Sequence, residues 1–165
     1  EKIYFIEVNP RVQGEHTITE ELTGIDLIRS QINVFCGLSI QDQNLTEVNI
    51  IGKRASIQAR LNMESYDKKI QLVPATGTIK EYDIASGPGI RVDGAGKVGF
   101  KNDGLYDSLL AKVIATSDLG LSEAVRKLNF TLRMSKISGV ETNKNLIIEV
   151  LNQEKLDPEK WLIKK

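Results

Sequence analysis

The sequence predicts an α+β fold in which a largely antiparallel sheet is flanked by helices. Strand patterns gather in the middle of the chain, where residues 54–64 alternate between polar and apolar side chains over their whole length. Helical patterns lie on both sides, at residues 26–35 and from residue 122 onward. Strands grouped between helices are typical of an α+β domain rather than of a parallel α/β sheet.

Composition limits the classes of function. The 165 residues carry 22 Lys+Arg and 22 Asp+Glu, so the formal net charge is zero. This balance argues against a nucleic-acid-binding protein, and no apolar run reaches the ~20 residues that a membrane helix needs. We therefore expect neither nucleic acid nor membrane as a partner. The single cysteine, Cys36, lies among apolar residues and is predicted to be a small buried side chain in a reducing compartment.

The first predicted elements are a strand, a loop and a helix. Residues 2–9 are rich in Ile, Tyr, Phe and Val, which predicts a buried strand, and the polar residues 10–24 predict a functional loop. A native domain seldom begins inside a buried strand, so we expect the chain to be part of a longer protein. Asp26 begins a helix that runs to about Phe35 and stops at Gly37. One face of this helix is apolar: Leu27, Ile28, Ile32 and Phe35.

The later elements follow a polar connector at residues 39–47. The core-facing side chains of the alternating strand are Ala55, Ile57, Ala59, Leu61 and Met63. Three further short strands are predicted, near residues 78–83, 89–93 and 109–116. Ser122 and Thr142 are the expected N-caps of two final helices. Their predicted inward side chains are Val125, Leu128 and Leu132 in the first helix, and Leu146, Ile147 and Val150 in the second. Trp161, in the tail, is interpreted as a docking anchor.

A row of polar side chains is the main candidate for chemistry. Every second residue of the row is polar: Glu7, Asn9, Arg11, Gln13 and Glu15. In an extended chain these side chains share one face. A half-buried strand with a solvated polar face is the open alternative. Function is favoured because residues 3–8 are nearly all apolar and would bury Glu7, where an unpaired carboxylate is costly.

The residue types in this row fit a metal site beside an anion site. Glu7 and Asn9 offer two hard oxygens to a Mg²⁺ ion that is held partly by phosphate. Arg11 provides a planar fork of donors for a small oxyanion, and Gln13 adds an amide. Glu15 is then a carboxylate beside an anion site, which makes it a candidate general base.

The loop that carries these residues must bend if they serve one site. Fully extended, Glu7 and Glu15 would lie roughly 27 Å apart. Gly14, which separates Gln13 from Glu15, allows the backbone to approach a ligand closely. We therefore expect a bent loop whose backbone contributes to binding.

The same residues carry a family resemblance. The run Glu7-Val-Asn-Pro-Arg-Val-Gln-Gly-Glu-His16 closely resembles the signature of biotin carboxylases, which belong to the ATP-grasp superfamily. Three further segments resemble blocks of that family in the same order: residues 19–28, 55–64 and 106–114. The chain thus resembles the C-terminal part of the biotin carboxylase unit of pyruvate, acetyl-CoA and other acyl-CoA carboxylases.

This resemblance implies a domain organisation and a reaction. It implies the end of an ATP-grasp domain at residues 1–36, a biotin carboxylase C-terminal domain at residues 37–152 and a tail at residues 153–165. The implied enzyme is an ATP-dependent ligase that carboxylates biotin on a carrier protein through carboxyphosphate. Its cofactors are ATP with Mg²⁺ or Mn²⁺, and a biotin attached elsewhere, since this sequence has no Met-Lys pair. The sequence also has no nucleotide-binding loop of the family, so we expect the chain alone to be inactive.

The resemblance implies roles for the residues of the polar row. Glu7 and Asn9 match the metal-site residues of the family. Arg11, Gln13 and the backbone of Gly14 match the bicarbonate site. The family usually has Val where this chain has Gly14, so we expect a freer loop and weaker positioning of bicarbonate.

Three further matches complete the implied site. Glu15 matches the base that deprotonates bicarbonate, and Arg60 matches the arginine that stabilises the ureido oxygen of biotin. Arg11, Glu15 and Arg60 are therefore the expected catalytic residues. Arg91 aligns with an arginine of the family's dimer interface.

The implied partners are the remainder of the biotin carboxylase unit, a biotin carboxyl carrier domain, a carboxyltransferase and a second copy in a homodimer. The expected location is the cytoplasm, or the mitochondrial matrix in a eukaryote. One alternative function is a non-catalytic assembly module. Another is a ligase like carbamoyl-phosphate synthetase, whose Glu-x-Asn-Pro-Arg motif is followed by small hydroxylated residues. The run Gln13-Gly14-Glu15-His16 at that place in this chain disfavours it.

Overall fold

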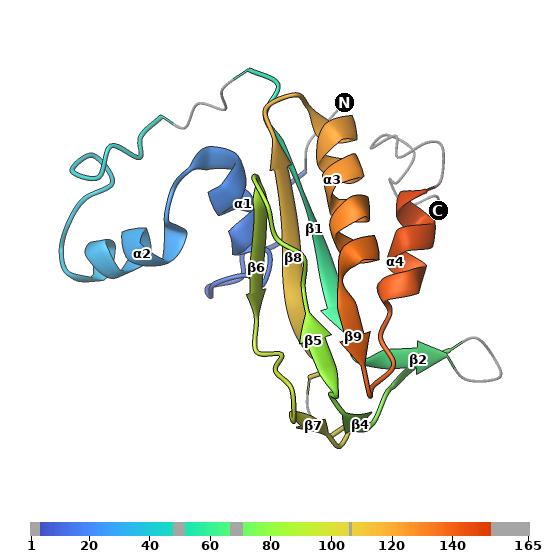
Figure 1. Ribbon diagram of the computed structural model, residues 1–165. Coiled ribbons are helices and arrows are strands. Elements are labelled where there is room, and N and C mark those ends of the chain that lie inside the picture. Colours follow the sequence, from blue (N-terminus) through green and yellow to red (C-terminus); the bar gives the residue numbers. More distant parts are fainter. Residues whose placement is uncertain (1–3, 48–51, 67–70, 106, 153–165) are drawn as a thin grey trace.

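A three-stranded antiparallel sheet forms the centre of the molecule (Figure 1). The structure is a computed structural model that describes residues 4–47, 52–66, 71–105 and 107–152. Its central strands are β1 (Ala55–Asn62), β8 (Leu109–Ser117) and β6 (Ile90–Gly94), in the order β1-β8-β6. The predicted α+β class with an antiparallel sheet is confirmed. The predicted docking anchor Trp161 lies outside the described residues.

Three further antiparallel pairs consist of short strands. They are β2 (Glu64–Tyr66) with β3 (Leu72–Pro74), β4 (Gly77–Thr78) with β7 (Lys101–Asn102), and β5 (Glu81–Asp83) with β9 (Lys136–Ser138). The strands predicted near residues 78–83, 89–93 and 109–116 are confirmed, the first of them as the two short strands β4 and β5. The sequence did not predict β3, β7 and β9, because strands of two or three residues are too short to show an alternation.

Helices lie on both faces of the central sheet (Figure 1). On one face pack α3 (Leu121–Met134) and α4 (Lys144–Leu151), and on the other lies α1 (His16–Thr23). The helix α2 (Leu27–Phe35) extends away from the sheet. None of the helices in the described part of the chain is long and apolar enough to cross a membrane.

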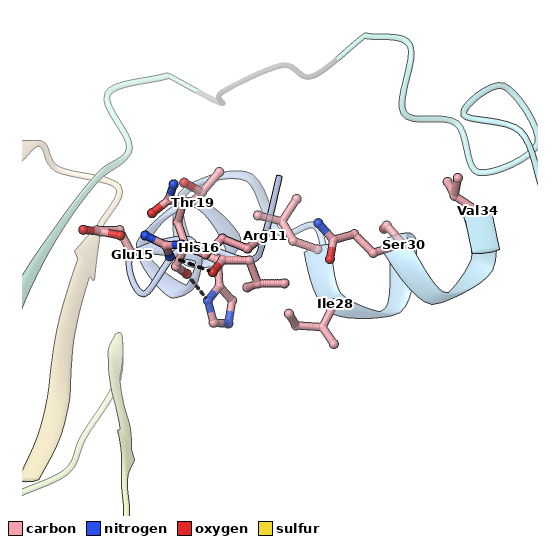
Figure 2. A pocket seen from close by; sticks show the side chains of 11 residues that line it. Arg11, Glu15, His16, Thr19, Ile28, Ser30 and Val34 are labelled. Carbon is pink, nitrogen blue, oxygen red and sulfur yellow. Dashed lines mark hydrogen bonds between the residues drawn. The ribbon is translucent and has the colours of Figure 1, made fainter. Parts of the chain in front are cut away.

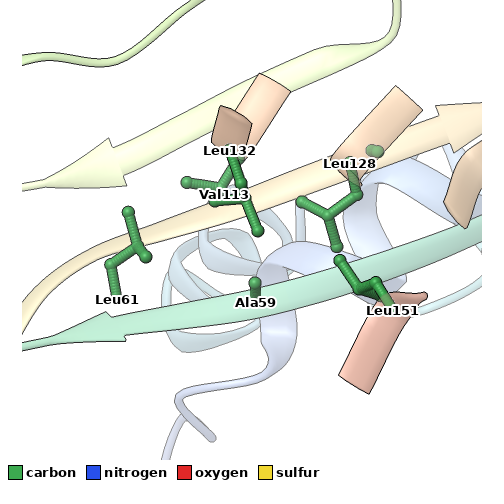
Figure 3. Close-up of a cluster of buried hydrophobic side chains, with 7 residues drawn as sticks. Ala59, Leu61, Val113, Leu128, Leu132 and Leu151 are labelled. Carbon is green, nitrogen blue, oxygen red and sulfur yellow. The ribbon is translucent and has the colours of Figure 1, made fainter. Parts of the chain in front are cut away.

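The main core lies between the sheet and the helices α3 and α4 (Figure 3). The predicted alternation of β1 holds, since Ala59 and Leu61 are buried and face this core. The antiparallel register pairs Ala59 with Val113 and Leu61 with Ala111, so the apolar face continues onto β8. The helices contribute Leu128, Leu132 and Leu151. A register shift between Leu61 and Asn62 ends the regular pairing of β1 with β8.

The predicted strand at residues 2–9 is wrong over the described residues 4–9. None of these residues belongs to a strand, and the side chain of Ile6 is 88% exposed. A strand needs a partner for its backbone hydrogen bonds, and no described strand pairs with this segment. Glu7 is accordingly exposed rather than buried.

The predicted loop at residues 10–24 contains a helix, α1. Its sequence includes β-branched residues with modest helix propensity, so local pattern gave little sign of it. The helix ends at Gly24, whose φ of 74° is left-handed and whose N–H donates to the Glu20 carbonyl. Thr17 is fully buried against the sheet, so a tertiary contact fixes a segment of weak propensity.

The helix predicted from Asp26 to Phe35 is confirmed, but its surroundings are not as predicted. The Asp26 carboxylate caps α2 by accepting a hydrogen bond of 2.8 Å from the backbone N–H of Arg29. No residue of α2 is buried, and Phe35 is 93% exposed. Cys36 is also exposed, contrary to the prediction.

Both C-terminal helices are confirmed, but each begins one or two residues away from the predicted cap. Gly120 is the N-cap of α3, and Ser122 lies inside its first turn. Asn143 rather than Thr142 is the N-cap of α4.

The inward side chains of α4 also differ from the prediction. Leu146 is exposed, while Leu151 is buried in the core. Ile147 packs against the core as predicted, and Ile148 packs there too, so the core-facing stripe lies one residue further along α4 than predicted.

Candidate functional site

The polar row forms a bent loop that leads into α1. The backbone N–H of Arg11 donates to the Asn9 carbonyl at 2.8 Å, and that of His16 donates to the Gln13 carbonyl at 3.1 Å. These local bonds replace the strand pairing that would hold an extended chain. The predicted alternation of the row along one extended face is therefore wrong, whereas the expected bend is present.

A pocket of about 800 Å³ lies between this loop, α1 and α2 (Figure 2). Arg11, Gln13 and Glu15 line it from the loop. The facing wall comes from α2: Leu27, Ile28, Ser30, Gln31 and Val34. The structure therefore brings together three of the side chains that the sequence singled out, although α2 played no part in that prediction.

His16, the single histidine of the chain, holds the loop at Gln13. Its Nδ1 lies 2.7 Å from the Gln13 carbonyl oxygen (Figure 2). A carbonyl oxygen can only accept, so Nδ1 carries the proton of this hydrogen bond. Ring and backbone of His16 thus both bind one carbonyl, which fixes the bend in front of Gly14.

Glu15 forms an ion pair with Arg60 of β1. The carboxylate Oε1 lies 2.9 Å from Nη2 of Arg60, and both side chains are about half exposed. In Figure 2 the Glu15 side chain points toward the strands. A half-exposed pair adds little to the stability of the fold. Its importance lies in geometry, because it joins the loop to the sheet.

Gly14 and Lys112 complete the contact between the loop and the sheet. A Cβ on Gly14 would lie 2.8 Å from Nη2 of Arg60, so the guanidinium fills the space of the missing side chain. The ammonium of Lys112 on β8 donates to the Gly14 carbonyl at 3.3 Å. Sequence reasoning missed Lys112, although it is the only charged residue in the strand Leu109–Ser117, which is otherwise apolar or small.

Polar contacts also fasten α1 to the sheet. The hydroxyl of Thr17 donates to Oε1 of Gln58 on β1 at 2.8 Å. Arg91 on β6 donates to Glu20 at 2.8 Å and to Asp93 at 2.9 Å. The hydrogen bond to Asp93 is the largest cause of a raised pKa of Arg91, and the hydrogen bond to Glu20 adds to it, so Arg91 stays charged. These contacts hold α1 against β6.

The proposed metal residues lie beside each other, outside the pocket. The Asn9 amide donates to Oε1 of Glu7 at 3.2 Å, and both side chains are exposed. Two such side chains can supply only part of a coordination sphere for Mg²⁺. Within the described ranges, no group of three or more His, Cys, Asp or Glu side chains could hold a metal ion.

Two family models match this chain. The biotin carboxylase C-terminal domain matches residues 58–163, which include the central sheet and α3 and α4. The carbamoyl-phosphate synthase L chain, ATP binding domain, matches residues 1–43, which include the loop with α1 and α2.

The chain belongs to the biotin carboxylase C-terminal domain family.

The similar proteins include pyruvate carboxylases and a 2-oxoglutarate carboxylase. Human mitochondrial pyruvate carboxylase is 40% identical over 154 residues, which are 93% of this chain and 13% of that protein. The complete multifunctional pyruvate carboxylase from Rhizobium etli superposes with a TM-score of 0.86 at 36% identity, covering 97% of this chain and 16% of that one.

A third relative is a solved structure with ligands. The biotin carboxylase domain dimer of 2-oxoglutarate carboxylase from Hydrogenobacter thermophilus, in complex with MgADP, ADP and bicarbonate, superposes with a TM-score of 0.79 at 35% identity. The match covers 93% of this chain and 32% of that one. The chain thus spans between 13% and 32% of the length of these relatives.

Proposed function

We propose that this chain is part of a biotin carboxylase, an ATP-dependent ligase that carboxylates biotin on a carrier protein through carboxyphosphate. The observation that carries the proposal is the ion pair of 2.9 Å between Glu15 and Arg60. This contact supports the proposal, because it joins the proposed base of the first step to the proposed anion-stabilising group of the second. Two half-reactions that share a short-lived intermediate need such proximity.

The residues of the pocket would hold and activate bicarbonate. Arg11 and Gln13 offer donors to its oxygens, and both line the pocket together with Glu15. Glu15 would remove the proton of bicarbonate, because the deprotonated oxygen is a better nucleophile toward the γ-phosphate than the protonated one. Arg60 would then stabilise the developing negative charge on the ureido oxygen of biotin.

The exposed pair of Glu7 and Asn9 would bind the metal of the nucleotide. One carboxylate and one amide oxygen fit Mg²⁺ or Mn²⁺ that takes its other ligands from phosphate and water. The metal would neutralise phosphate charge during the attack. The complex of the Hydrogenobacter thermophilus domain with MgADP and bicarbonate supports a magnesium nucleotide as ligand.

The exposed apolar surface of the N-terminal part supports a larger assembly. Residues 4–8 and the helix α2 expose large apolar side chains: Tyr4, Phe5, Ile6, Val8, Ile32, Val34 and Phe35. Surfaces of this kind mark interaction sites. We propose that the remainder of a biotin carboxylase unit covers them, with residues 1–36 as the end of its ATP-grasp domain, residues 37–152 as its C-terminal domain and residues 153–165 as a tail.

The other proposed partners follow from the reaction. A carrier domain brings biotin, and a carboxyltransferase selects the final acceptor. A homodimer is supported by the dimeric Hydrogenobacter thermophilus domain, and Arg91 is the proposed interface residue. We propose a cytoplasmic or mitochondrial location, in line with the mitochondrial human relative.

A ligase like carbamoyl-phosphate synthetase is the second candidate, and the match of residues 1–43 favours it. That match covers the loop and two helices only. Carboxylases match 93% of the chain at 35–40% identity. The carboxylase proposal therefore accounts for more of the molecule.

The test is substitution of Glu15 in the full-length enzyme that contains this chain. Glu15→Gln keeps size and hydrogen bonding but removes the base. We expect bicarbonate-dependent ATP cleavage to fall by about 10²–10⁴-fold, which is the usual worth of a general base. Glu149→Gln on α4, an exposed carboxylate remote from the loop, is the matched control and should retain full activity. Near-normal turnover of Glu15→Gln would remove Glu15 from the mechanism and favour an assembly role.

A further inference from the structure

Two cations approach the same segment of the loop from adjacent strands. Arg60 on β1 and Lys112 on β8 are direct partners in the antiparallel register. Directly opposed residues point to the same face of a sheet, which here is the face covered by α1. Like charges in this arrangement destabilise a sheet. Their pairing therefore requires a reason outside the sheet.

The reason lies in what the two cations contact. Arg60 binds the carboxylate of Glu15 at 2.9 Å, and Lys112 binds the carbonyl of Gly14 at 3.3 Å. Lys112 forms no ion pair in the described part of the chain. Its other cross-strand neighbour, Asp93, already binds Arg91 through both carboxylate oxygens, at 3.0 and 2.9 Å. The loop carbonyl is thus the polar contact of this ammonium.

Gly14 is adapted to this arrangement through its size rather than its backbone freedom. It is not among the glycines with positive φ, so a larger residue could adopt its backbone conformation. A Cβ at this position would, however, lie 2.8 Å from Nη2 of Arg60. The missing side chain lets the guanidinium lie against the loop.

We propose that Lys112 is a positioning residue for Glu15, and that it clamps the Gly14–Glu15 peptide together with Arg60. The peptide is planar and trans, so a fixed Gly14 carbonyl also fixes the direction of the N–Cα bond of Glu15. Arg60 then fixes the carboxylate itself. Lys112 thereby sets where the base stands in the pocket without touching a substrate. This inference rests on the proposed role of Glu15 as the base.

The experiment compares Lys112→Met, Lys112→Arg and the control Lys101→Met in the full-length enzyme. Lys101 is an exposed lysine of β7, remote from the loop. We expect Lys112→Met to lower kcat of bicarbonate-dependent ATP cleavage by about 10- to 100-fold, since a displacement of about 1 Å at a reacting group has that effect. The KM for ATP should not change. Lys112→Arg should recover most of kcat, because arginine can also donate to the carbonyl, and Lys101→Met should equal the unmodified enzyme.

Gly14→Ala provides an independent variant. Its methyl group would collide only with the flexible end of Arg60, so the fold should persist while the guanidinium moves away from Glu15. Because the family usually has Val at this position, we expect a smaller loss of kcat than in Lys112→Met. If both changes disturb one clamp, the double variant Gly14→Ala/Lys112→Met should lose less than the product of the two single losses.

Each contrary outcome is informative. Equal kcat values for Lys112→Met and Lys101→Met would overturn the proposal. So would a Lys112→Arg variant that loses as much kcat as Lys112→Met while both melt at lower temperature, since this pattern indicates a structural role only. An inactive Glu15→Gln with a normal Lys112→Met would refute the clamp and leave the proposed function intact. An active Glu15→Gln would refute both.

Discussion

The neighbouring helices α1 and α2 are similar in length but differ in how they are held. The 8-residue α1 lies on the sheet, where Thr17 is fully buried and Arg91 binds Glu20. The 9-residue α2 has the clearer amphipathic pattern, yet none of its residues is buried. Its end, Phe35, is 93% exposed.

The difference separates what an amphipathic pattern predicts from what it leaves open. The apolar stripe of α2 indicates which face seeks a partner, but the partner is set by tertiary structure. The helix α1 is fixed instead by a few polar contacts to residues far along the chain, such as the bond between Thr17 and Gln58. Polar docking of this kind has no period in the sequence, so it escapes pattern analysis.

Removing a polar contact that holds α1 on the sheet should have the largest effect on the unfolding free energy. Thr17→Val keeps the shape of the side chain but leaves Oε1 of Gln58 without its donor, which should cost about 1–3 kcal/mol of unfolding free energy. Urea denaturation of the chain measures this cost. The control Thr19→Val changes an exposed threonine of the same helix and should cost far less. Equal costs for the two variants would contradict polar docking of α1.

A smaller effect is expected at the start of α2. Asp26→Ala removes the N-cap that accepts from Arg29, which should weaken the helix by about 1 kcal/mol. Hydrogen exchange should become faster in α2 and stay nearly unchanged in α1. Glu20 of α1 accepts a hydrogen bond of 2.9 Å from the backbone N–H of Leu27, but α1 keeps its own contacts to the sheet. Asp26→Asn preserves the cap and is the matched control. Faster exchange in α1 as well would show that the helices form one cooperative unit.

The smallest effect is expected at the end of α2. Phe35→Ser changes a side chain that is 93% exposed, so the unfolding free energy of the chain should shift by no more than about 0.5 kcal/mol. In the full-length enzyme the same change should cost more, since we propose that another part of the unit covers this surface. Thermal denaturation of both proteins provides the comparison. The same small shift in both would argue against a covered apolar face.

Much of the sheet and its covering helices could be predicted from sequence. The alternation through Ala59 and Leu61 identified β1 and its core face, because every second residue of a half-buried strand is apolar. The strand predicted at residues 2–9 failed for the opposite reason. Apolar composition signals a need for burial, but a strand forms only where another strand accepts its hydrogen bonds.

The candidate site was predictable in its residues but not in its geometry. The polar row and the resemblance to a family signature identified the loop from Arg11 to Glu15 as a candidate site. Arg60 came from that resemblance, and its place on the polar face of β1 agreed with the alternation. Lys112 could not be assigned in this way, because its role depends on the register that places it opposite Arg60. Register is a property of two strands together, so neither strand alone encodes it.

The bond between Lys112 and Gly14 joins residues 98 positions apart in the chain. Closing so long a segment lowers the chain entropy before the contact can stabilise the fold, and such non-local contacts form slowly. The strand β8 must also pair with β1 before Lys112 and Arg60 stand side by side. We therefore expect the loop geometry to appear late in folding, after the sheet has closed. During synthesis, a chain that has not yet emerged as far as β8 can contain every residue from Glu7 to Arg60 and still lack the arranged site.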